Sequence, residues 1–230
     1  MFFFITFASS DIIQAGIRLA LQAHNLRLFD DIRLYSDTDL RKDKPFWDKH
    51  QEFILSNKRG YGYWIWKPYL IQKHLAQMSD GDVLLYLDAG CELDTKKRGM
   101  LESYLPIVRR DKMVVTGSHR PEVLWTKADL AFIWPLDDSE QIQSGIIMLQ
   151  VCKETRKLIK EWYEYACSYH LINDDPSHRP NHPEFQEHRH DQSILSLLAK
   201  RYKLYSRTSL EPAIEILRNK TGESRIIQGS

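Results

Sequence analysis

The sequence predicts one α/β domain with a mostly parallel sheet and helices on both of its faces. Short apolar runs alternate with longer segments whose apolar residues recur at helical spacing. The run from Val83 to Leu87 is wholly apolar, as expected of a strand buried on both faces in a parallel sheet. A chain of 230 residues, 43% of them hydrophobic, is long enough to build one substantial core around such a sheet.

Each element follows from a local signal. In order, we expect a strand at 2–7, a helix after Asp11, a strand at 32–35, a polar loop at 42–45, a helix opened by Pro68, strands at 83–87, 113–116 and 145–149, a helix at 156–169, a helix from Asp191 and a last strand at 203–205. Proline suits a first helical turn, so residues 59–67 are the loop that feeds the helix at Pro68. Residues 1–217 then form the domain, and 218–230 form a loose polar tail.

The composition narrows the function classes and the location. A net charge of +1 argues against a nucleic-acid partner, and three cysteines without a CxxC pair suit a reducing compartment. The opening MFFFITFASS has no basic n-region and is too short to span a membrane, so we expect a buried strand and a cytoplasmic protein of unknown oligomeric state. A peripheral membrane contact stays open through the basic residues Lys200, Arg201, Lys203 and Arg207.

Asp88 ends the apolar run and is followed by the small residues Ala89 and Gly90. Ligands of open α/β sheets bind outside the carboxyl ends of the strands, so this acid is expected to face a metal or phosphate crevice. The alternative is an aspartate that only caps the following turn.

Three segments carry a resemblance to a known family. GDVLLYLDAGCEL resembles the strand and "DxD" turn of nucleotide-sugar-dependent glycosyltransferases with the Rossmann-like GT-A fold. QSGIIMLQ is similar to a later strand of the glycogenin and galactinol-synthase type, and HRHDQSILSLLAKRY resembles their "DQ" helix. The order and spacing also match, and the GYGYWIWKP segment is similar to a loop of bacterial and viral polysaccharide-building transferases.

The resemblance implies a hexosyltransferase that moves a sugar, with retention, from a nucleotide-diphosphate donor to a hydroxyl of a glycan, glycolipid or protein. A UDP-sugar is the favoured donor, and polysaccharide biosynthesis the favoured context. The alternative is a catalytically silent nucleotide-sugar-binding module or partner subunit of a glycan-assembly complex, which the residue at position 90 supports. The family has a second acid there, whereas this chain has Gly90.

A divalent cation, Mn²⁺ or Mg²⁺, is implied with Asp88 as its protein ligand. Such hard ions keep waters and take phosphate oxygens as ligands, so one carboxylate can suffice. Alternatively Asp88 binds the ribose, while Lys67 and Arg59 neutralise the phosphates. The competing interpretation places both cations on a solvated loop.

The aromatic segment 61–66 offers flat faces for a base or a sugar ring. Core packing is the competing role, and only Tyr61 and Tyr63, which neighbour glycines, are expected to be exposed.

Asp191 is the expected catalytic carboxylate, because the "DQ" resemblance places it near the donor sugar, where it would stabilise oxocarbenium-like charge. An ordinary helix N-cap is the alternative. The loop before it is expected to be an acceptor-site flap. Its histidines also suggest a less favoured zinc site, formed by His178, His182, His188 and His190.

The remaining site residues are implied by topology and by the resemblance. The donor contacts are Thr6, Ala8, Ser9, Asp37, Arg59, Tyr61, Lys67, Asp88, Ala89 and Gly90. The acceptor or sugar contacts are His119, Trp125, Lys127, Gln143, Ser144, Gly145, His190 and Gln192.

Overall fold

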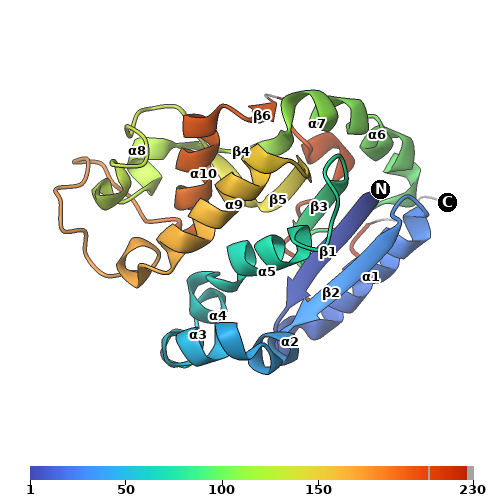
Figure 1. Cartoon of the computed structure of the whole chain (residues 1–230), viewed down its shortest axis with the longest axis horizontal. Coiled ribbons are helices and arrows are strands. Elements are labelled where there is room, and N and C mark those ends of the chain that lie inside the picture. Colours follow the sequence, from blue (N-terminus) through green and yellow to red (C-terminus); the bar gives the residue numbers. More distant parts are fainter. Residues whose placement is uncertain (207, 227–230) are drawn as a thin grey trace.

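One six-stranded sheet organises the fold, which a computed structural model describes for residues 1–206 and 208–226 (Figure 1). The sheet order is β2-β1-β3-β5-β4-β6. Its strands are β1 (Phe2–Ala8), β2 (Asp31–Ser36), β3 (Val83–Asp88), β4 (Met113–Pro121), β5 (Glu140–Gln150) and β6 (Tyr205–Ser206). Neighbouring strands pair in parallel except where β5 runs antiparallel to β3 and β4. The predicted mostly parallel sheet is confirmed.

Helices cover both faces of the sheet, as predicted. The helical segments are α1 (Ile13–Leu26), α2 (Asp37–Lys42), α3 (Lys44–Ser56), α4 (Gly60–Tyr63), α5 (Trp66–Leu75), α6 (Arg98–Glu102), α7 (Leu105–Asp111), α8 (Glu122–Trp125), α9 (Lys153–Ala166) and α10 (His190–Tyr202). Short 3-10 turns occur at Ser10–Ile12, Thr95–Lys97, Ala128–Leu130, Tyr169–Leu171 and Glu211–Ala213.

The core consists of two main apolar clusters, one on each side of the sheet. Side chains of β3 alternate between them, because successive residues of a strand point to opposite faces. Leu84 and Tyr86 join the cluster with α5, α9 and α10, whereas Leu85 and Leu87 join the cluster with α1, α6 and α7. Asp88 therefore projects toward the side of α5 and α10.

The direction of the chain's winding reverses between β1 and β3. From β1 the chain passes to β2 on one side, whereas β3 pairs with the other edge of β1, with Phe7 opposite Asp88. Such a switch point places a ligand crevice outside the carboxyl ends of the two strands. The fold therefore puts Asp88 at the edge where a ligand is expected.

The predicted polar loop at 42–45 is wrong, since α2 and α3 occupy this region. Ser36 and Asp39 form a reciprocal capping box that starts α2, and Pro45 lies in the first turn of α3. The side chains of Phe46 and Ile54 are buried on the side of α3 that faces the core. These capping signals are present in the sequence, but its charged composition obscures them.

Residues 60–64 form a left-handed turn, because Gly60, Tyr61, Gly62, Tyr63 and Trp64 all have φ between 51° and 82°. Left-handed backbone costs a non-glycine residue roughly 1–2 kcal/mol. Glycine is required at 62, where a Cβ would lie 2.7 Å from Ile54. The expected exposure of Tyr63 is wrong, since its side chain is buried, whereas Tyr61 is half-buried.

The C-terminal segment makes hydrogen bonds with the body of the protein, although residues 220–225 are exposed. The Glu92 carboxylate is buried and accepts hydrogen bonds from Asn219 Nδ2 at 2.7 Å and from the Arg225 N–H at 2.9 Å. A buried carboxylate requires such partners, and these donors tie the tail to the body of the protein. Residues 227–230 of the predicted tail lie outside the described residues.

No helix in the described residues is long and apolar enough to cross a membrane. The basic group suggested for membrane contact is not assembled as expected, because Lys200 is buried and donates to Glu122 at 2.7 Å. Arg207 lies outside the described residues.

Candidate functional site

A buried lysine lies between two carboxylates at the carboxyl edge of β3. Lys67 is 1% exposed, and its Nζ lies 3.1 Å from Asp88 Oδ1 and 3.4 Å from Asp191 Oδ2. The same Nζ lies 3.2 Å from Ser144 Oγ. The predicted loop placement of Lys67 is wrong, because this residue belongs to the first turn of α5.

Three elements bring these charges together. Asp88 is the last residue of β3, whereas Lys67 and Asp191 lie in the first turns of α5 and α10. Two tryptophans hold the first turns of these helices in place. Trp66 of α5 stacks on Phe7 with ring centroids 3.8 Å apart, and Trp162 donates a hydrogen bond to the Asp191 carbonyl of α10 at 2.8 Å.

Asp88 is the carboxylate of this cluster that solvent reaches, since its side chain is 40% exposed. Tyr86 donates to Oδ1 at 2.6 Å, on the same oxygen that Lys67 approaches. Oδ2 faces Gly145, where a Cβ would lie only 2.7 Å from it. Because glycine at 145 has no side chain, Asp88 Oδ2 can occupy this space.

Asp191 is 3% exposed, and its Oδ2 is paired with the Lys67 ammonium at 3.4 Å without a hydrogen bond of normal geometry. Burial raises its pKa to about 6, although the Lys67 ammonium opposes the rise. The simple capping alternative finds no support, because Arg189 is the N-cap of α10 and the helix start has no side-chain cap bond.

Lys67 keeps its charge in this setting. Burial alone would lower the pKa of its ammonium, but Asp191 and Asp88 outweigh that effect, so the pKa is raised. With both carboxylates ionised the three groups carry a formal charge of −1, which favours a cationic ligand or a proton.

A buried polar network supports the far side of this cluster. Gln192 Nε2 donates to Gln141 Oε1 at 2.6 Å, and its Oε1 lies 3.4 Å from the Ser144 N–H. Gln141 in turn donates to buried Glu122 at 3.1 Å. Such satisfied networks hold side chains in one arrangement.

Six of the predicted site residues are therefore brought together. They are Lys67, Asp88, Ser144, Gly145, Asp191 and Gln192. Gln143 lies beside them on β5, but its amide donates to the Gly117 carbonyl at 2.7 Å.

The predicted donor contacts on β1 and β2 lie at neighbouring strand ends. Ser10 donates to both oxygens of Asp37, at 2.7 and 2.8 Å, which joins the ends of β1 and β2. Ser9 donates to Asp11, and Ala8 packs with Ala89. The hydroxyl of Thr6 is buried and donates to the Leu87 carbonyl at 2.7 Å, so it is committed within the sheet.

Gly90 has a structural reason to lack a side chain. Its carbonyl accepts a hydrogen bond from the Asn219 N–H at 2.9 Å, and a Cβ would lie 3.0 Å from Arg218 Cα. The C-terminal segment thus covers the turn after Asp88, and a side chain at position 90 would require the Arg218 backbone to shift by a few tenths of an ångström.

Arg59 pairs with acids other than Asp88 and Asp191. It pairs with Asp174 at 3.2 Å and also with Glu187. Tyr63 donates to Asp174 at 2.9 Å, and a cavity of about 190 Å³ opens beside these acids and His188. The ring of Tyr61 lies 6.1 Å from that of Phe7.

Three other predicted acceptor contacts, Trp125, Lys127 and His119, have partners outside the Lys67 cluster. Trp125 lies between Arg120 and Arg189, each guanidinium 4.5 Å from its ring centroid. Lys127 is buried and donates to the His170 carbonyl at 3.0 Å. His119 is exposed and lies 3.1 Å from Glu140.

His190 has a packing role. Its ring lies 5.0 Å from that of Tyr63, and its Nδ1 is 2.7 Å from the Ile172 carbonyl. Burial lowers its pKa to about 4, so the ring is neutral at pH 7.

Three contributors were missed at the sequence level. Tyr86 bonds to Asp88, Asp174 joins Arg59 to Tyr63, and Arg18 donates to the Ala89 and Cys91 carbonyls. Strand alternation places Tyr86 and Asp88 on one face, which is a usable signal. The other two depend on contacts between distant segments.

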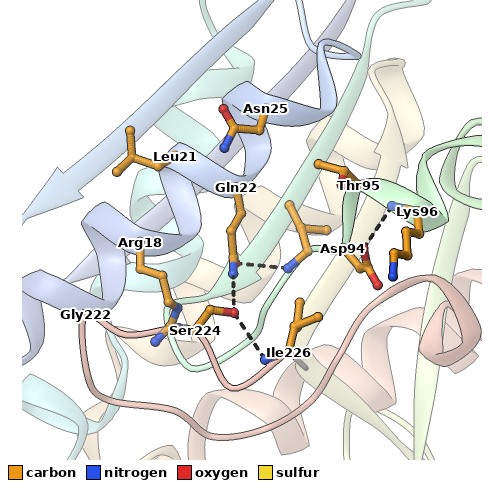
Figure 2. A pocket seen from close by; sticks show the side chains of 11 residues that line it. Arg18, Leu21, Gln22, Asn25, Asp94, Thr95, Lys96, Gly222, Ser224 and Ile226 are labelled. Carbon is orange, nitrogen blue, oxygen red and sulfur yellow. Dashed lines mark hydrogen bonds between the residues drawn. The ribbon is translucent and has the colours of Figure 1, made fainter. Parts of the chain in front are cut away.

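A cavity of about 490 Å³ lies away from this cluster, between α1 and the C-terminal segment (Figure 2). Arg18, Gln22 and Ser224 line it, and Gln22 Nε2 approaches Ser224 Oγ at 3.3 Å. It opens on the sheet face opposite Lys67 and Asp191.

Comparison with known proteins gave matches among solved structures only. No protein-family model matched the chain, and no curated protein matched it. Mouse xyloside xylosyltransferase 1 is similar at 12% identity and a TM-score of 0.46, over 91% of this chain and 86% of that protein. The galactosyltransferase LgtC is similar at 15% identity and a TM-score of 0.47, over 85% of this chain and 70% of LgtC. A glycosyltransferase involved in glycosylation of the PBCV-1 major capsid is similar at 10% identity and a TM-score of 0.39, over 71% of this chain and 65% of that protein.

Proposed function

We propose that this chain is a glycosyltransferase that moves a sugar from a nucleotide-diphosphate donor to a hydroxyl of a glycan, glycolipid or protein. The observation that carries the proposal is the buried Lys67 ammonium between Asp88 and Asp191, at the switch point of the sheet. The sequence resemblance to the DxD turn and the DQ helix agrees with it. The sequence resemblance also favours a UDP-hexose donor and retention at the anomeric carbon.

Asp191 and Lys67 have different roles in the proposed reaction. In the proposed reaction the bond between the anomeric carbon and the diphosphate oxygen breaks, and the acceptor oxygen bonds to that carbon. The hydroxyl proton passes to the departing diphosphate. Asp191 stabilises the positive charge that develops on the sugar, while Lys67 holds the Asp191 and Asp88 carboxylates in place.

A divalent cation fits this site through Asp88 only. Oδ2 of Asp88 is open to a ligand, whereas Gly90 supplies no second carboxylate. Mn²⁺ or Mg²⁺ would therefore take its other ligands from water and the donor phosphates, and would offset the charge of the leaving group. Unchanged donor turnover in EDTA would remove this role from Asp88.

Donor hydrolysis tests the transferase proposal. A panel of sugar nucleotides is screened by thermal shift with and without Mn²⁺, and the best ligand is then assayed for release of free nucleoside diphosphate. We expect slow release that Asp88→Ala abolishes. Asp111→Ala is the matched control, because Asp111 pairs with Arg110 at 2.7 Å on the surface.

The covered Gly90 turn favours a second candidate, a nucleotide-sugar-binding module without turnover. Such a module would bind the same donor and release no nucleoside diphosphate with any acceptor. Tight binding without turnover would therefore replace the enzyme proposal by this one.

A further inference from the structure

Three potential metal ligands meet at one point outside the Lys67 cluster. Asp129, His170 and His178 come from three separate segments, and one ligand atom of each lies within 4.8 Å of the others. His170 Nε2 is 2.7 Å from Asp129 Oδ2, and the two imidazole rings are stacked 3.8 Å apart at 8°.

The donor set suits a borderline transition ion. Two imidazoles and a carboxylate are ligands of Zn²⁺, which binds them at about 2.0–2.2 Å and leaves a fourth position to water. Ligand atoms around such an ion are roughly 3.3–3.5 Å apart in tetrahedral geometry. Parallel stacked rings cannot both direct a nitrogen lone pair at one ion, so the rings must splay, and the exposed His178 side chain is the one that would turn.

The carboxylate is held in place independently of the imidazoles. Asp129 is 9% exposed and accepts the backbone N–H groups of His178 and Arg179, both at 3.0 Å. Hydrogen bonds of this kind orient a metal-binding carboxylate and support its affinity.

We propose that Asp129, His170 and His178 bind one divalent transition ion of the Zn²⁺ type. The ion fastens the irregular segment 173–189 to the body of the protein. This segment carries Asp174 and Glu187, the partners of Arg59, so the ion would hold one wall of the smaller cavity.

This site differs from the four-histidine zinc hypothesis drawn from the sequence. His188 and His190 are directed at the carbonyls of Leu171 and Ile172, at 2.8 and 2.7 Å. His182 accepts the Glu184 N–H at 3.2 Å. Of those four, only His178 belongs to the cluster found among the described residues.

Metal titration of the full chain tests the proposal. After chelator treatment and dialysis, Zn²⁺ binding is followed by calorimetry, and Co²⁺ by its visible absorption, which is intense in a tetrahedral site. We expect one Zn²⁺ per chain and protection of 173–189 from hydrogen exchange when Zn²⁺ is added. His170→Ala and His178→Ala should each weaken binding about tenfold or more.

His182→Ala is the matched control, because it removes a histidine of the same loop from outside the cluster. Circular dichroism shows whether each variant is folded, and the exposed His178 is the safest position to change. Zn²⁺ binding that is undiminished in His178→Ala, or absent in the unmodified chain, would overturn the proposal. Neither outcome depends on donor turnover, so the transferase proposal is tested separately.

Discussion

The ammonium of Lys67 lies 3.4 Å from the Asp191 carboxylate, and both side chains are buried. Asp88 adds a second carboxylate 3.1 Å from the same ammonium. Neither acid on its own defines the arrangement, because one buried lysine pairs with both.

Lys67→Met should destabilise the fold and stop donor hydrolysis. It leaves two carboxylates near each other without a cation, and loss of one partner of a buried ion pair costs about 3–5 kcal/mol. Urea denaturation measures the change in the free energy of unfolding. Lys157→Met is the control, since the exposed Lys157 pairs with Glu161 only at 3.9 Å, and it should change stability by less than about 1 kcal/mol. Equal effects of the two changes would contradict the burial argument.

Because of Asp191, the stability of the fold and the rate of donor hydrolysis should change in opposite directions as the pH rises. The Asp191 pKa of about 6 lies above the ordinary aspartate value of 3.8, so the folded state binds more protons than the unfolded state between these pH values. Its contribution to stability is therefore full below about pH 4 and is lost as the pH rises to 6, an effect on the order of 3 kcal/mol. Donor hydrolysis should instead rise over this range as the carboxylate ionises.

Asp191→Asn isolates this group from other acids. Burial opposes the ionisation of Glu92, but its hydrogen bonds outweigh that effect and lower its pKa to about 2, which gives the opposite pH trend. The informative quantity is the difference in unfolding free energy between the two proteins, measured from pH 4 to 7. We expect this difference to vary with pH and donor hydrolysis to fall about a hundredfold or more. A difference that does not change with pH would show that Asp191 titrates normally.

The sequence predicts the positions of the two acids, but it does not predict the contacts that surround them. Asp88 and Asp191 carry local signals, one at the end of an apolar strand and the other at the start of a helix. Whether Lys67 is buried depends on how α5 docks on the sheet, and no local pattern specifies that docking. The contact of Gly90 with Arg218 joins segments more than a hundred residues apart, so the absent second acid had no visible physical reason in the sequence.

The same limit applies to the acceptor side. The predicted contact residue Trp125 lies between Arg120 of β4 and Arg189, and its contact with Arg189 depends on the packing of the 173–189 segment against α8. The left-handed turn at 60–64 also lacks a sequence signal, because three of its five residues are not glycine.

Gly145→Ala should disable the site while the fold persists. The new Cβ would lie 2.7 Å from Asp88 Oδ2 and would push that carboxylate aside. A displacement of about 1 Å in a reacting group can cost about a hundredfold in rate, which donor hydrolysis would reveal. Gly99→Ala is the control, because no atom lies within 4 Å of its added Cβ. Unchanged hydrolysis in Gly145→Ala would mean that Asp88 Oδ2 takes no part.

Gly90→Asp should fail to create a complete cation site. The substitution restores the acid spacing of the DxD pattern, yet its Cβ would lie 3.0 Å from Arg218 Cα, and backbone cannot give way as a flexible side chain can. We expect a loss of about 1–3 kcal/mol in unfolding free energy from overpacking, and faster hydrogen exchange in 218–226. Mn²⁺ affinity, measured by calorimetry with the best nucleoside diphosphate present, should not rise. Gly99→Asp controls for the added charge. Tighter Mn²⁺ binding with full stability would instead show that the tail yields at this turn and that the second carboxylate can reach the ion.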